Sequence, residues 1–327
     1  MKKRMFAVMA GLLALTMALS ACSSKSATGD SSSAAETNIK LATGGTSGTY
    51  YAFGGVIAQA VTASTGIKFD VQSTGASKAN IGLIADGEVD MAIVQNDVMD
   101  YAYNGTDLFE GEKTDNFNAM AAMYAEVCQV VAKPSAGIET IADLKGKRVS
   151  VGDAGSGVEF NAKQILEAYG VTFEDIEKQN LSFGDSANAM KDNKIDAFFC
   201  TAGAPTTAIM ELSSTNEVKI LNVDGAEAEA LVAKYPFYTA YTIPKETYSG
   251  MTEDATTVSV KATFIVSPEL SEDTVYNMTK AIFEGKEDIT AGHAKGAEID
   301  PTYAVEGVSV PFHPGAEKYF KEIGVLK

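Results

Sequence analysis

The sequence has few of the side chains from which metal sites and acid–base sites are usually built. Of its 327 residues only two are histidine and three are cysteine. His293 and His313 both lie far along the chain from every Gly/Ser-rich loop, and His313, between Phe312 and Pro314, is typical of a packed turn residue. These residues offer no zinc-site spacing, and no Asp-rich calcium loop is present. The sequence therefore predicts no metal, no cofactor and no catalytic triad.

The motifs of nucleotide binding and of nucleophilic catalysis are missing or incomplete. Gly146-Lys147 is followed by arginine and lacks the earlier glycine of a phosphate loop. Gly155-Ser156-Gly157 follows a strand-like run, as a dinucleotide fingerprint would, but Phe160 occupies the place of the third glycine. Neither Gly/Ser loop has the spacing of a nucleophile elbow. An exported enzyme that uses Ser or Asp at a cleft is therefore the least favoured function.

Basic residues are also scarce. The chain has 26 Lys and Arg against 43 Asp and Glu, a formal net charge of −17. Such acidity disfavours nucleic acid and anionic membrane surfaces as partners of the folded part. It does not exclude a small anionic ligand, because local hydrogen-bond donors can outweigh a distant net charge. With 46% hydrophobic and 21% charged residues, the chain is expected to fold rather than to be disordered.

The N-terminus is typical of an exported lipoprotein. Basic residues at 2–4 and an apolar run precede Leu19-Ser20-Ala21-Cys22, which predicts a signal peptide over 1–21 and lipidation of Cys22. The Ser-rich residues 22–37 are expected to form a tether between the lipid and the folded part. The alternative is an ordinary signal peptide with an incidental cysteine. We expect the mature protein outside the cytoplasm, lipid-anchored to the membrane on its periplasmic or extracellular side.

The two remaining cysteines lie in apolar, strand-like runs. An exporting compartment permits a disulfide between Cys128 and Cys200. Buried free thiols are the favoured alternative, because both runs read as core strands.

The apolar pattern predicts two similar βαβαβ units, a little over a hundred residues apart. Strands are expected at 39–42, 68–72 and 89–94 and again at 148–151, 181–183 and 195–200, with helices at 50–61, 79–85, 158–169 and 187–191. The paired motifs Glu88-Val89-Asp90-Met91-Ala92-Ile93 and Lys194-Ile195-Asp196-Ala197-Phe198-Phe199 support this repeat. A generic α/β pattern that matches by chance is the alternative.

Both units place Gly, Ser and Thr where a strand ends and a helix begins, which is where open α/β sheets bind ligands. A helix start offers free N–H groups and about half a positive charge, suited to a carboxylate or phosphate. Further candidates at strand ends are Gln95, Asn96, Tyr124 and Gly203, and Lys78 either pairs with an anion or is merely solvated. Alternatively, the loops are flexible turns with good caps.

Several motifs together resemble the TAXI group of solute-binding proteins, which serve tripartite ATP-independent periplasmic (TRAP) transporters. The resemblance runs through almost the whole mature chain, in the segments 42–51, 73–80, 87–97, 141–149, 155–157, 194–199, 235–238 and 310–316. It departs from the group at Ala76, which replaces a glycine, and at Lys78, which stands in an apolar position.

The resemblance implies an α/β fold of the periplasmic-binding-protein type II, or Venus-flytrap, kind, in which each of two lobes is a mostly parallel sheet flanked by helices. It places lobe I at 38–128 and 240–327 and lobe II at 129–239, with two hinge crossings. Together with the candidates above, the ligand-binding residues are predicted to be Thr43, Thr46, Gly48, Thr49, Tyr50, Thr74, Ser77, Gln95, Asn96, Tyr124, Ser156, Gly157 and Gly203.

The implied function is binding without catalysis. The protein is expected to capture a small carboxylated solute, glutamate, glutamine or a related acid, and to deliver it to a TRAP permease. A binding protein of an ABC importer and a ligand sensor with the same fold are the alternatives.

Overall fold

The computed structural model describes residues 38–327. The predicted signal peptide (1–21) and the tether with Cys22 (22–37) lie outside these residues and stay predictions. No helix in the described part of the chain is long and apolar enough to cross a membrane.

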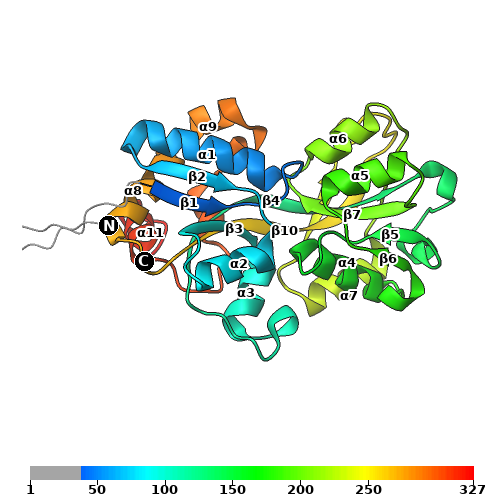
Figure 1. The fold of residues 1–327 in the computed structure, drawn as a ribbon, viewed down its shortest axis with the longest axis horizontal. Coiled ribbons are helices and arrows are strands. Elements are labelled where there is room, and N and C mark those ends of the chain that lie inside the picture. The colour runs from blue at the N-terminus through cyan, green and yellow to red at the C-terminus, as the bar shows by residue number, and fades with distance from the viewer. Residues whose placement is uncertain (1–37) are drawn as a thin grey trace, which may run out of the picture. The chain divides into compact units, whose positions relative to one another are not determined.

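Lobe I is built on the first βαβαβ unit. Its central strand pairs in parallel with a neighbour on each side, which gives the order β2-β1-β3. The helices cover both faces of this sheet (Figure 1). The elements of the unit are β1 (Asn38–Ala42), α1 (Thr49–Thr65), β2 (Lys68–Gln72), α2 (Ser77–Ala85), β3 (Met91–Gln95), α3 (Asn96–Asn104) and η1 (Asp107–Phe109).

Lobe II repeats the same arrangement with the order β6-β5-β7, again parallel. The repeat that the sequence predicts is therefore confirmed. The elements are η2 (Pro134–Ala136), η3 (Ile141–Leu144), β5 (Arg148–Ser150), α4 (Gly157–Ala168), η4 (Phe173–Asp175), β6 (Glu177–Gln179), α5 (Phe183–Lys191), β7 (Ala197–Ala202), α6 (Thr207–Ser213), β8 (Lys219–Leu221), α7 (Gly225–Lys234) and β9 (Thr239–Ile243).

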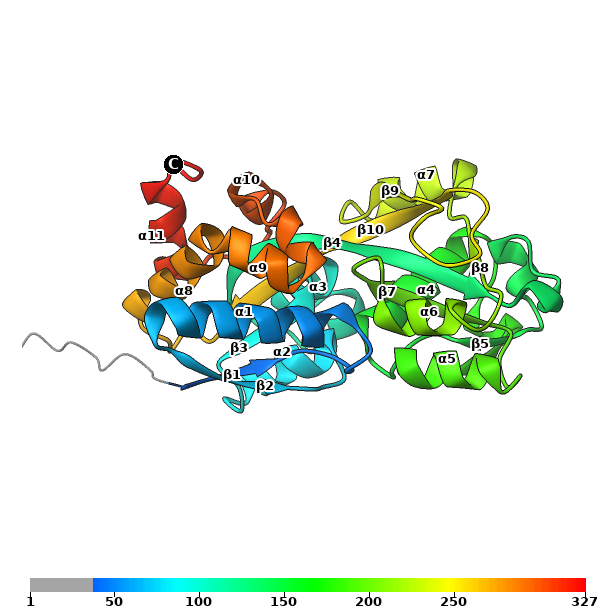
Figure 2. The same ribbon diagram turned by 90° about the horizontal axis from the view of Figure 1, so that it is seen from above.

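Two long strands, β4 (Asn118–Ala132) and β10 (Ala255–Val266), run through both lobes. They are antiparallel to each other. β10 pairs with β3 of lobe I and β4 pairs with β7 of lobe II, so all strands join one mixed sheet (Figure 2). The strands of the β2-β1-β3 and β6-β5-β7 groups are parallel, as predicted, whereas β8, β9 and the two crossing strands form antiparallel pairs. After β10 the chain returns to lobe I as α8 (Glu272–Glu284), α9 (Lys286–Gly292), η5 (Ala294–Glu298), α10 (Pro301–Val305) and α11 (Pro314–Glu322).

The predicted lobe boundaries stay predictions, but the crossings can be placed. The first lies within β4. The second lies within β10 rather than near residue 239, because β9 pairs with the first part of β10 and Ile243 and Tyr248 pack into a lobe II core.

The matched aspartates of the repeat have the same structural role in both lobes. Asp90 accepts a hydrogen bond from the backbone N–H of Lys40 in β1 (2.8 Å), and Asp196 accepts one from Arg148 in β5 (3.0 Å). Each carboxylate thereby ties the turn before the third strand to the first strand. The Val-Asp and Ile-Asp motifs thus serve the fold rather than the ligand site.

One predicted strand is wrong. Residues 181–183 do not form a strand: β6 ends at Gln179, and α5 already begins at Phe183. The reason is a helix cap, since the Ser182 hydroxyl accepts from the N–H of Asp185 (3.2 Å) and donates to its carboxylate (2.8 Å). This shift brings Ser182 and Phe183 to the mouth of the site described below.

Each lobe has a hydrophobic cluster on both faces of its sheet. Cys128 and Cys200 are buried within the lobe II clusters and are free thiols, as favoured. His313 is 2% exposed and caps α11 by accepting from the N–H of Gly315 (3.2 Å), so its prediction as a packed residue is confirmed.

Candidate functional site

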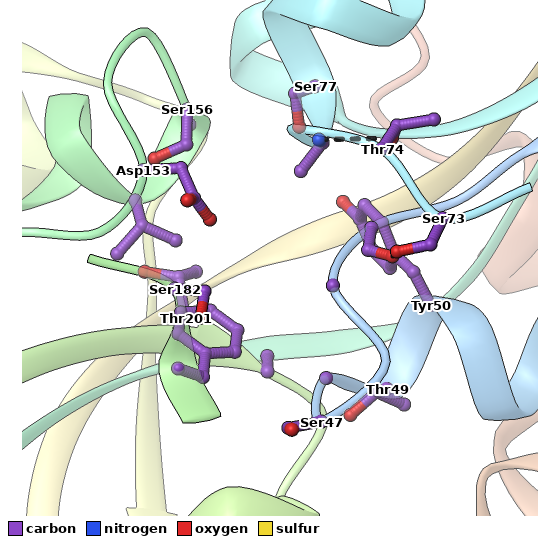
Figure 3. Close-up of a pocket in the computed structure, with 18 of the residues that line it drawn as sticks. Ser47, Thr49, Tyr50, Ser73, Thr74, Ser77, Asp153, Ser156, Ser182 and Thr201 are labelled. Carbon is purple, nitrogen blue, oxygen red and sulfur yellow. Dashed lines mark hydrogen bonds between the residues drawn. The ribbon is translucent and has the colours of Figure 1, made fainter. Parts of the chain in front are cut away.

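A cavity of about 320 Å³ lies between the two lobes. Its walls are the loops that follow β1 and β2 in lobe I and β5 and β6 in lobe II, together with the end of β7 and one residue of β4. Figure 3 shows hydroxyl side chains from both lobes around it, among them Ser47, Thr49, Ser156, Ser182 and Thr201. The size suits a small metabolite.

Five helices begin at this cavity, three from lobe I and two from lobe II. The residues that precede their first turns are Gly48 for α1, Ala76 for α2, Gln95 for α3, Ser156 for α4 and Ser182 for α5, and all five line the cavity. The first N–H groups of a helix have no partner within the helix and carry a partial positive charge. The cavity is therefore a place where several such charges converge.

The two lobes differ in how these helix starts are satisfied. In lobe II, Ser156 accepts from the N–H of Glu159 and Ser182 from that of Asp185, and each of these helices has that acidic residue in its first turn. In lobe I, neither α1 nor α2 has a side-chain cap or an acidic residue in its first turn. The starts of α1 and α2 are thus a stronger anion site than the starts of α4 and α5.

Ala76 holds an unusual backbone conformation at the start of α2. Its φ of 65° is one that glycine adopts far more readily than residues with a Cβ. The Thr74 hydroxyl accepts from the Ala76 N–H at 3.1 Å, the dashed line in Figure 3. The loop therefore adopts a glycine-like turn with an alanine in place.

Asn80 fixes the two lobe I loops relative to the sheet. Its amide donates to the carbonyls of Thr43 (2.6 Å) and Ile93 (2.7 Å), and its oxygen accepts from the Thr74 hydroxyl (2.6 Å). Asn80 is fully buried. It therefore positions the loops that carry the helix starts without lining the cavity itself.

Two carboxyl groups lie in the same cavity. Glu126 comes from β4, is 1% exposed, and accepts a hydrogen bond from the Tyr50 hydroxyl at 2.6 Å. Burial raises the pKa of Glu126 well above its usual value. Burial, with the nearby charge of Asp185, also raises the pKa of Asp153, which lies in the loop before α4. No Lys, Arg or His is among the described residues that line the cavity.

The lobes also touch beside the cavity through buried polar groups. Gln95 of lobe I donates to Asn161 of α4 (3.0 Å), and Asn161 in turn donates to Asp97 (3.0 Å) and to the Tyr238 hydroxyl (2.8 Å). Tyr238 donates to Gln164, three residues further along α4 (2.6 Å). Burial raises the pKa of Asp97 to about 6. This network stabilises the arrangement in which the lobes meet.

Most of the predicted ligand-binding residues lie together at the cavity, although their roles toward a ligand stay predictions. Those that line it are Thr46, Gly48, Thr49, Tyr50, Thr74, Ser77, Gln95, Ser156 and Gly157.

Four predicted residues do not line the cavity. Thr43 is fully buried and donates to the Gln72 carbonyl (2.7 Å), and the side-chain oxygen of Asn96 accepts from the Lys261 N–H (2.8 Å). Tyr124 packs edge-on against Phe53 in the lobe I core. The Gly203 carbonyl accepts from Thr49 across the lobes (3.1 Å). Thr43, Asn96 and Gly203 directly follow the ends of β1, β3 and β7, as expected, whereas Tyr124 lies inside β4 and not at a strand end.

Sequence reasoning missed several residues that line the cavity, including Glu126, Asp153, Ser182 and Phe183. A signal existed for two of them. Ser182 followed three residues later by Asp185 is a capping pattern, and Glu126 is the one charge in the otherwise apolar or polar-neutral strand 118–132.

The Thr49 hydroxyl gives a test of the contact between the lobes. We expect Thr49→Ala to weaken solute binding about fivefold, because one buried hydrogen bond contributes about 1 kcal/mol. Thr49→Ser keeps the hydroxyl and serves as the control. Isothermal titration calorimetry on both variants is the measurement, and equal affinity of Thr49→Ala and the unmodified protein would show that this bond does not support binding.

No group of three or more His, Cys, Asp or Glu side chains that could hold a metal ion occurs within residues 38–327.

The architecture has solved counterparts. The alkanesulfonate-binding protein SsuA from Xanthomonas axonopodis pv. citri, bound to MOPS, is 14% identical with a TM-score of 0.50 over 89% of this chain and 92% of that one. PhnD1 from Prochlorococcus marinus, in complex with methylphosphonate, is 10% identical with a TM-score of 0.55 over 88% of this chain and 96% of that one. A protein from Listeria monocytogenes assigned as an L-cystine ABC transporter is 17% identical, with a TM-score of 0.50 over 80% of this chain and 98% of that one.

The chain therefore has a periplasmic-binding-protein-like α/β fold, in agreement with the two-lobed prediction. The model of the NMT1-like family matches residues 41–324, and the chain belongs to that family. The predicted membership of the TAXI group is wrong on this finding, because the matching family is a different one and the similar structures are not described as TRAP components. The shared Gly/Ser loops reflect the helix starts of the fold, which is why they misled the assignment.

Proposed function

We propose that this protein is an extracytoplasmic solute-binding protein of an ABC importer, which captures a small anionic solute between its lobes and hands it to the membrane transporter. The observation that carries the proposal is the convergence of five helix N-termini on one cavity between two lobes. A carboxylate or another small anion is the group that such a site attracts.

The similar structures support this proposal rather than the TRAP function. Two are described with bound sulfonate or phosphonate compounds, which are small anions, and a third is assigned to an ABC transporter. Export and attachment through Cys22 are part of the proposal and agree with the periplasmic location of such proteins. The proposal also includes that the protein has no catalytic role: it binds its solute and releases it unchanged.

Closure of the lobes is the proposed mechanism. A solute that contacts both lobes favours the closed arrangement in proportion to its extra affinity for it. The two crossing strands, β4 and β10, connect the lobes and are the proposed hinge. The closed form then presents a surface made of both lobes to the transporter.

A thermal-shift screen of the purified protein tests this function. The panel contains amino acids, dicarboxylates, keto acids, sulfonates and phosphonates. A solute at 100 times its dissociation constant should add about 2.7 kcal/mol to the free energy of unfolding and raise the melting temperature by several degrees. Recovery of the solute unchanged after long incubation is expected. A panel without a single binder would contradict the proposal, and conversion of the solute would indicate an enzyme.

A further inference from the structure

Glu126 is a buried carboxyl group of the cavity. It faces the cavity from β4 and accepts a hydrogen bond from the Tyr50 hydroxyl (2.6 Å). No Lys, Arg or His among residues 38–327 forms an ion pair with it. The cation whose charge reaches it is that of Lys295, but the Lys295 ammonium is bound to Glu298 at 2.5 Å.

A buried acid of this kind is costly unless something neutralises it. Removing a carboxylate from water costs several kcal/mol, which a well-placed opposite charge can offset. Proteins seldom keep such a group at the floor of a cavity for packing alone, because a neutral side chain of the same size fills the space. We therefore expect the ligand to supply the positive charge that neutralises the Glu126 carboxylate.

Two parts of the cavity favour ligand groups of opposite charge. The starts of α1 and α2 lack caps and first-turn acids, so they attract an anion. Glu126, from the shared strand β4, and Asp153, from lobe II, attract a cation or a strong hydrogen-bond donor. Tyr50, in the first turn of α1, bonds Glu126 and so places the two preferences side by side.

We propose that Glu126 binds a cationic nitrogen of the solute, so that the substrates of this protein are small zwitterions whose anionic group lies at the starts of α1 and α2. The inference rests on the proposed solute-binding function. The ammonium donates N–H hydrogen bonds to the Glu126 carboxylate, while Tyr50 holds that carboxylate in place. Asp153 adds negative charge when the lobes meet. The acid residues, not a basic residue, thus determine which anions are accepted.

This binding mode has a proton signature. The titratable groups whose charge is coupled to that of Glu126 come from several elements: Tyr50 (α1), Asp97 (α3), Tyr124 and Cys128 (β4), Cys200 (β7), Lys295 (η5) and Tyr303 (α10). In the empty protein burial raises its pKa, and a bound ammonium lowers it again. Between those two values the carboxyl group loses its proton to solvent as the ammonium binds. Affinity should therefore rise with pH across that range.

The experiment compares solutes that differ only in the nitrogen. The panel contains the twenty common L-amino acids, taurine and 2-aminoethylphosphonate, each beside its analogue with a hydroxyl in place of the amine, and simple anions such as succinate and methylphosphonate. We expect the binders to be zwitterions, with affinities at least a hundredfold above those of their hydroxyl analogues. A hydroxyl analogue or simple anion that binds as tightly would overturn this inference and leave the solute-binding function intact. No binding by any compound would remove both.

Glu126→Gln tests the residue itself, since it keeps the shape and a hydrogen-bond acceptor for Tyr50. We expect the preference for the amine to fall at least tenfold, with the affinity for the hydroxyl analogue unchanged or improved. Titration calorimetry in buffers of different ionisation enthalpy should show proton release by the unmodified protein and none by Glu126→Gln. Glu110→Gln, which changes an exposed acid, is the control. If Glu126→Gln does not fold, Glu126→Asp should lower the same preference by shifting the carboxylate. An unchanged preference and unchanged proton release in a folded variant would exclude Glu126 from solute recognition.

Discussion

Gly157→Ala is expected to weaken solute binding by ten- to a hundredfold while the protein stays folded. A Cβ at this position would lie 1.8 Å from Oε1 of Gln95 and 3.1 Å from a methyl carbon of Val98. Gly157 belongs to lobe II, whereas both neighbours belong to lobe I. The collision therefore exists only when the lobes meet. Either the lobes stay apart or Gln95 moves and loses its hydrogen bond to Asn161, and both outcomes cost binding energy.

The affinity is measured by titration with a solute from the screen, and folding by circular dichroism and melting temperature. Gly45→Ala is the matched control, because it adds a Cβ at another cavity glycine that has nothing within 4 Å. The double variant Gly157→Ala with Gln95→Ala removes the colliding group and should recover part of the affinity lost by Gly157→Ala alone. Full affinity in the single variant would mean that Gln95 and Gly157 do not meet when the solute is bound.

The site was predictable from the sequence where its geometry is local. A Gly/Ser loop between a strand and an amphipathic helix places Thr49 and Ser156 at a helix start whatever the rest of the fold does. The repeat of that pattern indicates two such starts at matching positions. Because parallel strands of one sheet end at the same edge, the sequence also predicts that the loops share an edge.

Residues whose role depends on distant parts of the chain could not be predicted in this way. Glu126 lies in a strand of largely apolar residues, and nothing near it in sequence shows that β4 passes under a cavity. The contact of Gln95 with Asn161 joins residues 66 positions apart, from different lobes. Residues 181–183 were read as a strand because three residues are too few for a period to separate strand from helix.

The family assignment failed for a related reason. Motifs such as Gly155-Ser156-Gly157 and the Asp90 and Asp196 turns satisfy requirements of the fold: a helix cap, a close approach and a carboxylate that bonds the neighbouring strand. Other families with this fold have the same structural requirements and can therefore share these motifs. They therefore predict the architecture better than they predict the transporter that the protein serves.

Asn80→Ala is expected to destabilise the protein by about 3 kcal/mol, which makes it the largest expected loss of stability. The substitution removes the amide donor of the buried Thr43 and Ile93 carbonyls and one of the two acceptors of the Thr74 hydroxyl, which also donates to the Thr43 carbonyl at 2.9 Å. Each buried polar group left without a partner costs about 1–3 kcal/mol.

Urea unfolding of the solute-free protein measures this loss, and Asn104→Ala is the control. Asn104 makes one exposed hydrogen bond to the carbonyl of Asp100 (3.1 Å), so its replacement should change the free energy of unfolding by no more than about 0.5 kcal/mol. Because Asn80 holds the loops before α1 and α2, solute affinity should also fall in the variant molecules that remain folded. A loss below about 1 kcal/mol would mean that water replaces the amide, and that the loops carrying the helix starts are held by the sheet rather than by this side chain.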